Sequence, residues 1–237
     1  MKIFAHRGIH DHQTKENSRA ALEKIYDSKA DGIEIDLRLT KDGICVLSHD
    51  TKSQSNLRIS RHTFDQLSSD VSNIIPITEA MDILRDYSGI INLEIKHIFG
   101  ERDQKLGQQC IKVLARDKEV LFKSLESNIL ISSFSRSNIS SGASLLREIP
   151  RALLIARPKL FTKSIEKALL GDCEAIHLSL QQTRSKGFED FVDQAHEAKL
   201  KVRVFTVNEE SEFIRLKNAK VDGVYTDHVD RLVALNE

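Results

Sequence analysis

The hydrophobic pattern is clearest over residues 33–39, where apolar and charged side chains alternate at every position. That period of two predicts a β-strand. Side chains two apart on a strand share a face, so Glu34, Asp36 and Arg38 project to one side and the aliphatic residues project to the other. The alternation returns over residues 90–96. Taken alone, it is equally typical of an antiparallel strand whose polar face lies in water.

Strands and helices take turns along the rest of the chain. Strands are predicted at residues 2–6, 32–39, 90–96, 129–133, 151–155, 174–179, 201–207 and 222–226, and residues 44–47 are extended as well. Helices are predicted at about 16–29, 76–86, 103–117, 136–147, 161–170, 187–199, 209–218 and 228–235. Alternating strands and helices imply parallel pairing, and this number of units predicts a (β/α)8 TIM barrel. A doubly wound open sheet is the competing fold, but no G-x-G-x-x-G follows the first strand to support it.

Residues 50–75 do not fit the repeating unit. They are polar and serine-rich, without strong periodicity. We expect them to form a short insertion after the second barrel strand, over the carboxyl-terminal mouth where the active sites of such barrels lie. Residues 1–237 are then predicted to form a single barrel domain.

The barrel fold changes the meaning of the charged strand faces. Barrel strands are covered by helices outside and pack on one another inside, so neither face is freely wetted. Glu34, Asp36 and Glu94 must therefore point into the barrel near its mouth. Burying three carboxylates together is prohibitive without compensation, and carboxylate oxygens suit a hard divalent cation. The sequence thus predicts a metal site.

Composition excludes several kinds of partner. Lysine plus arginine equals aspartate plus glutamate, at 35 each, so nothing attracts the chain generally to nucleic acid or an anionic membrane. No apolar run approaches the roughly 20 residues of a membrane span, and His6 on the first strand leaves no room for a cleavable leader. The cysteines are widely spaced without a C-x-x-C pattern, so neither a disulfide framework nor a thiolate zinc site is predicted. The predicted setting is the cytoplasm.

Short motifs stand in a fixed order along nearly the whole chain. They are His6-Arg7-Gly8, Glu16-Asn17, Gly32-Ile33-Glu34-Ile35-Asp36, Thr40-Lys41-Asp42-Gly43, His49-Asp50, Leu93-Glu94-Ile95-Lys96, Ser132-Ser133-Phe134, Phe205-Thr206-Val207-Asn208 and Val221-Asp222-Gly223-Val224-Tyr225-Thr226-Asp227. In residue type and order this set resembles the glycerophosphodiester phosphodiesterase family, whose barrels are of the phospholipase-C-like kind. The chain departs from the family pattern at Lys15 and Cys45, where proline is usual, and at Phe205, where tryptophan is usual.

The resemblance implies a metal-dependent hydrolase. Glycerophosphodiesters such as glycerophosphocholine or glycerophosphoethanolamine would be cleaved to glycerol-3-phosphate and an alcohol. Glu34, Asp36 and Glu94 would ligate Mg²⁺ or Ca²⁺. His6 and His49 would serve as general acid and general base, in an order that the sequence leaves open. In the family, the neighbouring glycerol hydroxyl attacks phosphorus first, and water then opens a cyclic phosphate.

The resemblance also implies how the substrate is held. Arg7 and Lys96 would bind the phosphate as cations. Phe205 would form a wall of the substrate pocket, and Phe134 would join it or pack in the core. The partner is therefore a small glycerophosphodiester, and a homodimer is compatible with the resemblance.

Other polar residues receive less specific roles. Glu16 and Asn17 are expected to orient the metal ligands rather than react. The remaining histidines are predicted to be ordinary structural residues, and they are His10, His12, His62, His97, His177, His196 and His228.

Two other functions are compatible with parts of this pattern. A sphingomyelinase-D-like phospholipase shares the arrangement of histidines and acids, but it would suit secretion, disulfides and an apolar membrane-contacting loop, none of which is evident. A non-catalytic barrel that binds phosphorylated ligands would predict loss of a histidine or a carboxylate, and all five are present.

Overall fold

The computed structural model describes residues 1–69, 74–96, 101–123, 128–155 and 161–236. Its strands are β1 (Lys2–His6), β2 (Gly32–Leu39), β3 (Cys45–Leu47), β4 (Ile90–Ile95), β5 (Ile129–Ser133), β6 (Arg151–Ile155), β7 (Ala175–Ser179), β8 (Lys201–Phe205) and β9 (Gly223–Thr226). Its helices are α1 (Arg19–Glu23), α2 (Phe64–Ser68), α3 (Ile77–Ile83), α4 (Glu101–Arg116), α5 (Lys118–Leu121), α6 (Arg136–Leu145), α7 (Phe161–Leu170), α8 (Phe188–Glu197), α9 (Glu210–Asn218) and α10 (Val229–Ala234).

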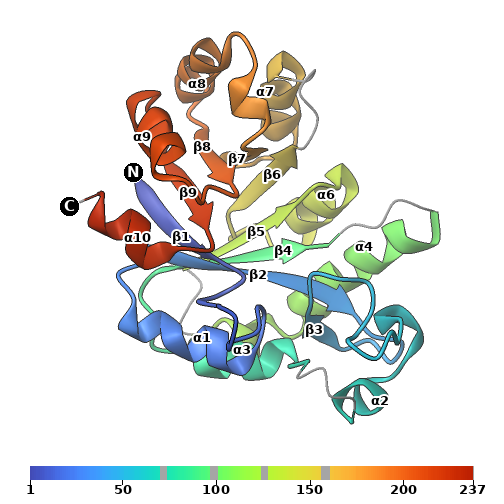
Figure 1. Cartoon of the computed structure of the whole chain (residues 1–237). Coiled ribbons are helices and arrows are strands. Elements are labelled where there is room, and N and C mark those ends of the chain that lie inside the picture. Colours follow the sequence, from blue (N-terminus) through green and yellow to red (C-terminus); the bar gives the residue numbers. More distant parts are fainter. Residues whose placement is uncertain (70–73, 97–100, 124–127, 156–160, 237) are drawn as a thin grey trace.

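Parallel strands close into a ring with helices around it (Figure 1). The strands pair in the order β1-β9-β8-β7-β6-β5-β4-β2, and β1 also pairs with β2. The predicted (β/α)8 barrel is confirmed. The ends of the chain lie on the same side of the molecule, where the side-chain amide of Asn236 donates to the carbonyl of Met1 at 3.0 Å.

Strand β3 lies outside this ring. It pairs antiparallel with the end of β2, with Leu47 opposite Leu37 and Cys45 opposite Leu39. The extended stretch predicted at 44–47 is thus the second arm of a hairpin, and this hairpin carries His49 back to the mouth of the barrel.

The first helix is shorter than the predicted span of 16–29. Asn17 has a left-handed backbone with φ of 53°, which a helix cannot include. The Ser18 hydroxyl then accepts a hydrogen bond from the amide of Ala21, so α1 begins only at residue 19. After Glu23 the chain tightens into a 3₁₀ turn, Lys24–Asp27, and leaves the helix.

Alternating side chains of the strands fill two separate cores. The outward aliphatic residues pack under the helices and form the main hydrophobic cluster. The inward residues fill the barrel, where the Arg203 guanidinium lies over the ring of Phe4, 5.0 Å from its centroid, and Tyr225 packs against the same ring at 4.8 Å. Gly32 faces this layer, because a Cβ there would lie 2.5 Å from a carbon of the Phe4 ring. The next inward layer towards the mouth carries the acidic residues.

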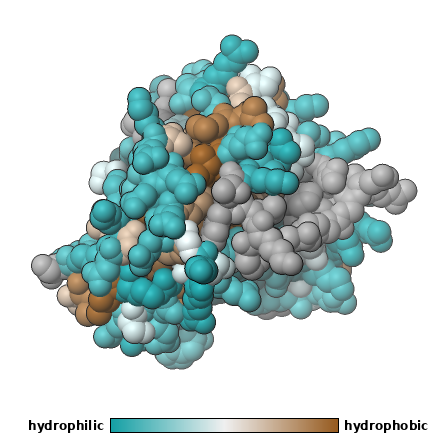
Figure 2. Space-filling view, turned by 90° about the horizontal axis from the view of Figure 1, so that it is seen from above, coloured by the Kyte–Doolittle hydropathy of each residue, from teal (hydrophilic) through white to brown (hydrophobic). Residues whose placement is uncertain are grey.

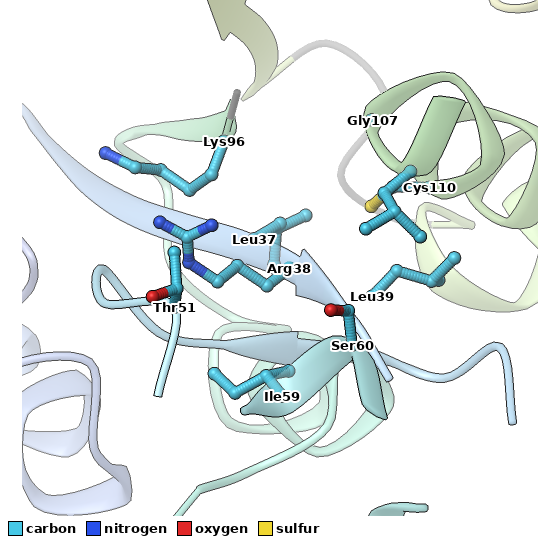
Figure 3. A pocket seen from close by; sticks show the side chains of 10 residues that line it. Leu37, Arg38, Leu39, Thr51, Ile59, Ser60, Lys96, Gly107 and Cys110 are labelled. Carbon is cyan, nitrogen blue, oxygen red and sulfur yellow. The ribbon is translucent and has the colours of Figure 1, made fainter. Parts of the chain in front are cut away.

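The predicted insertion packs as a small unit beside the mouth. It contains a 3₁₀ turn, Ile59–Arg61, and α2, and its apolar side chains form a cluster of their own with Val46. Residues 70–73 of the predicted 50–75 segment lie outside the described residues. A pocket separates the insertion from α4, with Ile59 and Ser60 on one side and Cys110 on the other (Figure 3). The insertion therefore lies beside the barrel wall near its carboxyl-terminal mouth.

The surface is mainly hydrophilic in the view from above, with hydrophobic residues gathered in a band near its middle (Figure 2). Among the described residues, the helices are all too short or too polar to cross a bilayer. All three cysteines are free.

Candidate active site

Strand register brings the three predicted acidic residues together. Strand β2 lies between β1 and β4, with Glu34 opposite His6 and Asp36 opposite Glu94. Glu34 is level with the last residue of β1, Glu94 is the penultimate residue of β4, and each acid is less than a tenth exposed. One oxygen atom from each lies within 4.8 Å of the other two. The fold therefore creates a compact cluster of carboxylates from residues far apart in the sequence.

The three carboxyl groups are not equivalent. Burial, together with the charges of Asp36 and Glu94, holds the pKa of Glu34 well above its ordinary value. Burial also raises the pKa of Glu94, although Lys96 opposes the shift. Burial acts in the same direction on Asp36, but Lys96 and Arg7 outweigh it and lower the pKa of this group. Asp36 is thus held ionised, whereas Glu34 is driven towards its neutral form.

Lys96 lies between two of these acids. Its ammonium is 3.0 Å from Asp36 Oδ1 and 2.8 Å from Glu94 Oε1. Burial lowers the pKa of Lys96, yet the two carboxylates more than compensate and leave it raised. The predicted phosphate-binding cation is therefore charged and located at the acidic cluster.

The cluster fits a hard divalent cation. All of its donors are carboxylate oxygens, the ligands preferred by Mg²⁺ and Ca²⁺. Glu34 Oε1 is buried and has no hydrogen-bond partner among the described residues. A cation there would complete the coordination of this oxygen, and its positive charge would counteract the burial and the neighbouring charges that raise the Glu34 pKa. Glu34, Asp36 and Glu94 are thus able to hold a metal.

The loop after β1 adds rigid support. The backbone of Arg7 is left-handed, and its amide donates to Glu34 Oε2 at 3.0 Å. Its guanidinium pairs with both oxygens of Glu16, at 2.8 and 2.9 Å, and its Nε lies 3.4 Å from Asp36. The amide of Asn17 donates to Asp36 Oδ2 at 2.8 Å. Asn17 therefore contacts Asp36 directly, and Glu16 is linked to the acidic residues through Arg7.

His6 is held by an aspartate that the sequence analysis left without a role. His6 Nδ1 lies 2.7 Å from Asp227 Oδ1. The amide of Asn208 donates to the other oxygen of Asp227 at 2.7 Å. Hydrogen bonds from His10, His6 and Asn208 outweigh burial and lower the pKa of Asp227. The place of Asp227 in the chain could have indicated this contact. Because Thr226 pairs with Ala5, the residues that follow them, Asp227 and His6, meet at the mouth.

His49 approaches the cluster from the insertion side. Its carbonyl accepts from the guanidinium of Arg38, at 3.0 Å from Nε, and Nδ1 lies 3.0 Å from Asp50. Arg38 and Lys96 both line the neighbouring pocket and are seen together in Figure 3. Burial and the charge of Lys96 lower the pKa of His49. This imidazole is thus kept neutral by its surroundings.

The remaining histidines lie in different parts of the fold. His10 reaches the mouth, where its Nε2 is 3.3 Å from Asp227 Oδ1, so treating it as an ordinary structural residue overlooked its place at the site. His177 lies in the barrel beneath the acids, 3.3 Å from the hydroxyl of Tyr225. His62 and His196 make contacts elsewhere, and His97 lies outside the described residues.

An aromatic wall borders the site on the side of His6. Phe205, at the end of β8, lines a recess with His6, Glu34, Glu94 and Leu154. Phe134 packs edge-on against Phe205, with ring centroids 5.9 Å apart. On the other side, His49 opens onto a polar groove formed by the loop before α1 and the insertion. The two histidines thus face different surroundings.

The protein is a (β/α)8 barrel that carries two histidines and a buried acidic cluster at the end of the barrel where such folds have their active sites. A model described as the glycerophosphoryl diester phosphodiesterase family matches residues 6–231, so the chain belongs to that family. It is accordingly an enzyme, a phosphoric diester hydrolase.

Individual relatives cover nearly the whole chain. A glycerophosphodiester phosphodiesterase of Bacillus altitudinis is 28% identical over an alignment of 259 positions that covers 100% of this chain and 98% of the relative. One from Caldanaerobacter subterraneus is 24% identical, over 98% of this chain and 96% of the relative. A solved phosphodiesterase of Oleispira antarctica, in complex with the product sn-glycerol-3-phosphate, superposes with a TM-score of 0.83 at 23% identity and covers 99% of this chain and 96% of that chain.

Proposed function

We propose that the enzyme hydrolyses glycerophosphodiesters, including glycerophosphocholine and glycerophosphoethanolamine, to sn-glycerol-3-phosphate and an alcohol. The observation that carries this proposal is the meeting of His6, His49 and the acidic cluster at one mouth. The product bound by the Oleispira antarctica structure supports the choice of product. A cytoplasmic setting stays a prediction.

The acidic cluster supplies the metal site in this proposal. Glu34, Asp36 and Glu94 would hold Mg²⁺ or Ca²⁺, and the bound cation would supply positive charge to the phosphodiester oxygens. Lys96 adds a positive charge beside Asp36 and Glu94, and Arg7 fixes the position of Glu34 through its backbone amide. Arg7 also contributes a cation near the phosphate.

The two histidines move the protons. His49, whose pKa is lowered by burial and by Lys96, starts neutral and is suited to accept the proton of the attacking hydroxyl. His6 is held through Nδ1, so its Nε2 is directed away from Asp227 and is available to the substrate. The Asp227 carboxylate orients the His6 ring, and His6, the other histidine of the pair, is then assigned to donate a proton to the leaving alcohol from Nε2. The roles reverse when water opens the cyclic phosphate.

The substrate itself supplies the first nucleophile. The glycerol hydroxyl beside the phosphoester is held within the same molecule as phosphorus, which gives it an entropic advantage that external water lacks. Phe205 forms a wall for the bound substrate. The groove beside His49 is lined by charged and polar side chains of both signs, such as Lys52 and Asp50, so it tolerates different small polar head groups.

A 2-deoxy glycerol analogue tests this mechanism. Turnover of glycerophosphocholine is followed by ³¹P NMR beside the 2-deoxy compound, with the His6→Ala variant as the inactive control. We expect sn-glycerol-3-phosphate from the natural substrate and slow turnover of the analogue, which should still compete for the site through its phosphate. Release of choline phosphate would refute the reaction, and equal kcat for both compounds would show that water attacks directly.

A further inference from the structure

A second group of metal-ligand atoms lies at the mouth beside the acidic cluster. His6 at the end of β1, His10 in the following loop and Asp227 after β9 each offer one atom, and these atoms all lie within 4.8 Å of one another. His6 Nδ1 is 2.7 Å from Asp227 Oδ1, and His10 Nε2 is 3.3 Å from the same oxygen. All three side chains are partly buried, with 16%, 20% and 27% of their surface exposed.

We propose that His6, His10 and Asp227 form a binding site for Zn²⁺, and that zinc bound there inhibits the enzyme. The inhibition rests on the proposed function, because it acts through His6. The binding of zinc does not depend on that function.

The spacing suits a small tetrahedral ion. Bonds of 2.0–2.2 Å place the ligand atoms of tetrahedral zinc about 3.3–3.5 Å apart. His10 and Asp227 are already at 3.3 Å. His6 and Asp227, at 2.7 Å, are closer by about 0.6 Å, which a small side-chain rotation would provide. The third pair, His6 and His10, lies within 4.8 Å.

His10 Nε2 is the observation that points to a ligand. This nitrogen is buried and meets Asp227 Oδ1 at 3.3 Å, a long contact that leaves its hydrogen bonding weakly satisfied. A weakly satisfied buried polar atom is costly, and a bound cation would satisfy it. Asp227 supplies the negative charge, since its pKa is held below the ordinary value.

The two clusters select different cations. Imidazole nitrogens with one carboxylate suit zinc, whereas three carboxylates suit Mg²⁺ or Ca²⁺. A hard ion can therefore fill the acidic cluster while zinc occupies the histidine site. The water or anion that completes a tetrahedral zinc site would come from solvent.

Zinc at this site would stop proton transfer by His6. Binding to Nδ1 displaces a proton to solvent and leaves the remaining hydrogen on Nε2. The ring can then neither accept a second proton nor easily lose the one it holds, so it fails as acid and as base. It also loses its hydrogen bond to Asp227. Because the phosphate-binding residues are untouched, kcat should fall while KM changes little.

The test compares two histidines on the same loop. Enzyme saturated with Mg²⁺ is titrated with Zn²⁺ against a chromogenic zinc chelator, and turnover is measured in parallel, for wild type, His10→Ala and His10→Gln. His12→Ala is the matched control, because His12 is exposed and lies outside the group. We expect both His10 variants to bind zinc at least about tenfold more weakly, a difference of about 1.4 kcal/mol, and inhibition is expressed relative to each variant's own turnover without zinc. Their inhibition should weaken in parallel, and His12→Ala should match wild type.

Wild-type zinc affinity in both His10 variants would overturn the proposal, because inhibitory zinc would then be bound at the acidic cluster. Zinc that binds wild type more tightly than it binds the His10 variants, yet leaves kcat of wild type unchanged, would overturn the proposed inhibition. The chelator titration requires no turnover. An enzyme inactive towards glycerophosphodiesters would therefore refute the proposed function without affecting the zinc result.

Discussion

Replacing Glu34 by glutamine separates metal binding from folding. The amide keeps the shape of the side chain but removes the charge and weakens metal ligation. Glu34 is buried beside Asp36 and Glu94, and its pKa is held well above the ordinary value, first by burial. Its ionised form therefore destabilises the metal-free protein. We expect Glu34→Gln to abolish activity while the fold persists with equal or higher stability.

The sign of the effect on stability follows from proton linkage. A carboxyl group with a raised pKa in the folded state binds its proton more tightly there than in the unfolded chain. Its stabilising contribution is present below the unfolded pKa of about 4.3 and is lost as the pH rises through the folded value. At pH near 8, metal-free Glu34→Gln should gain about 1.4 kcal/mol for each unit by which the Glu34 pKa is raised.

Bound metal, by contrast, stabilises the wild type. At a cation concentration of about 100 times Kd, binding adds about 2.7 kcal/mol to the free energy of unfolding. For a chain of 237 residues, this corresponds to a rise in Tm of roughly 5–11 °C. Glu34→Gln should lose most of this rise, whereas Glu79→Gln on the outside of α3 should keep it.

Differential scanning fluorimetry with and without Mg²⁺ or Ca²⁺ measures both effects. The difference in metal-free Tm between wild type and Glu34→Gln reports the effect of the Glu34 charge on stability. The rise in Tm on adding metal reports metal binding at the site. A variant with the wild-type shift and wild-type turnover would refute the metal assignment, whereas a large loss of metal-free stability would refute the argument that ionised Glu34 is destabilising.

Further predictions concern the histidines and the pH dependence of metal binding. His6→Ala and His49→Ala should each lower kcat by about 10²–10⁴ in steady-state assays, with the metal-induced Tm shift retained; loss of that shift would make the residue a metal ligand. Asp227→Asn should lower kcat by about 10–100-fold and change the pH–rate profile, whereas Asp222→Asn, which disturbs the His196–Asp222 pair at 2.9 Å, should leave the profile unaltered. Metal affinity measured by calorimetry should fall on acidification at a higher pH than an ordinary glutamate would give, because the raised pKa of Glu34 lets protons compete; an affinity independent of pH down to about 5 would contradict the shift.

The strand periodicity carried most of the fold prediction. Inward and outward residues of parallel barrel strands differ sharply in burial, so the period of two fixed both the strands and the direction of Glu34, Asp36 and Glu94. Helix ends were less predictable. The start of α1 depends on the left-handed backbone of Asn17 and the Ser18 cap, which hydrophobic spacing does not encode.

The site could be predicted as far as motifs name their residues. The spatial neighbours of those residues could not, because they depend on which strand ends meet when the ring closes. Asp227 becomes a partner of His6 through the β1–β9 pairing, and Asn208 reaches Asp227 because β8 pairs with β9. His10 was interpreted as an ordinary histidine because loop sequence does not fix its direction. The single-domain prediction for residues 1–237 stays a prediction.

Removal and restoration of metal during turnover tests the proposed chemistry most directly. Purified enzyme is incubated with glycerophosphocholine, and free sn-glycerol-3-phosphate is measured before EDTA, after EDTA and after excess Mg²⁺ or Ca²⁺ is returned. We predict that EDTA abolishes product formation in wild type, that one of the two cations restores it, and that Glu34→Gln is inactive throughout. Undiminished release of sn-glycerol-3-phosphate by the metal-stripped enzyme would contradict a catalytic metal at Glu34, Asp36 and Glu94.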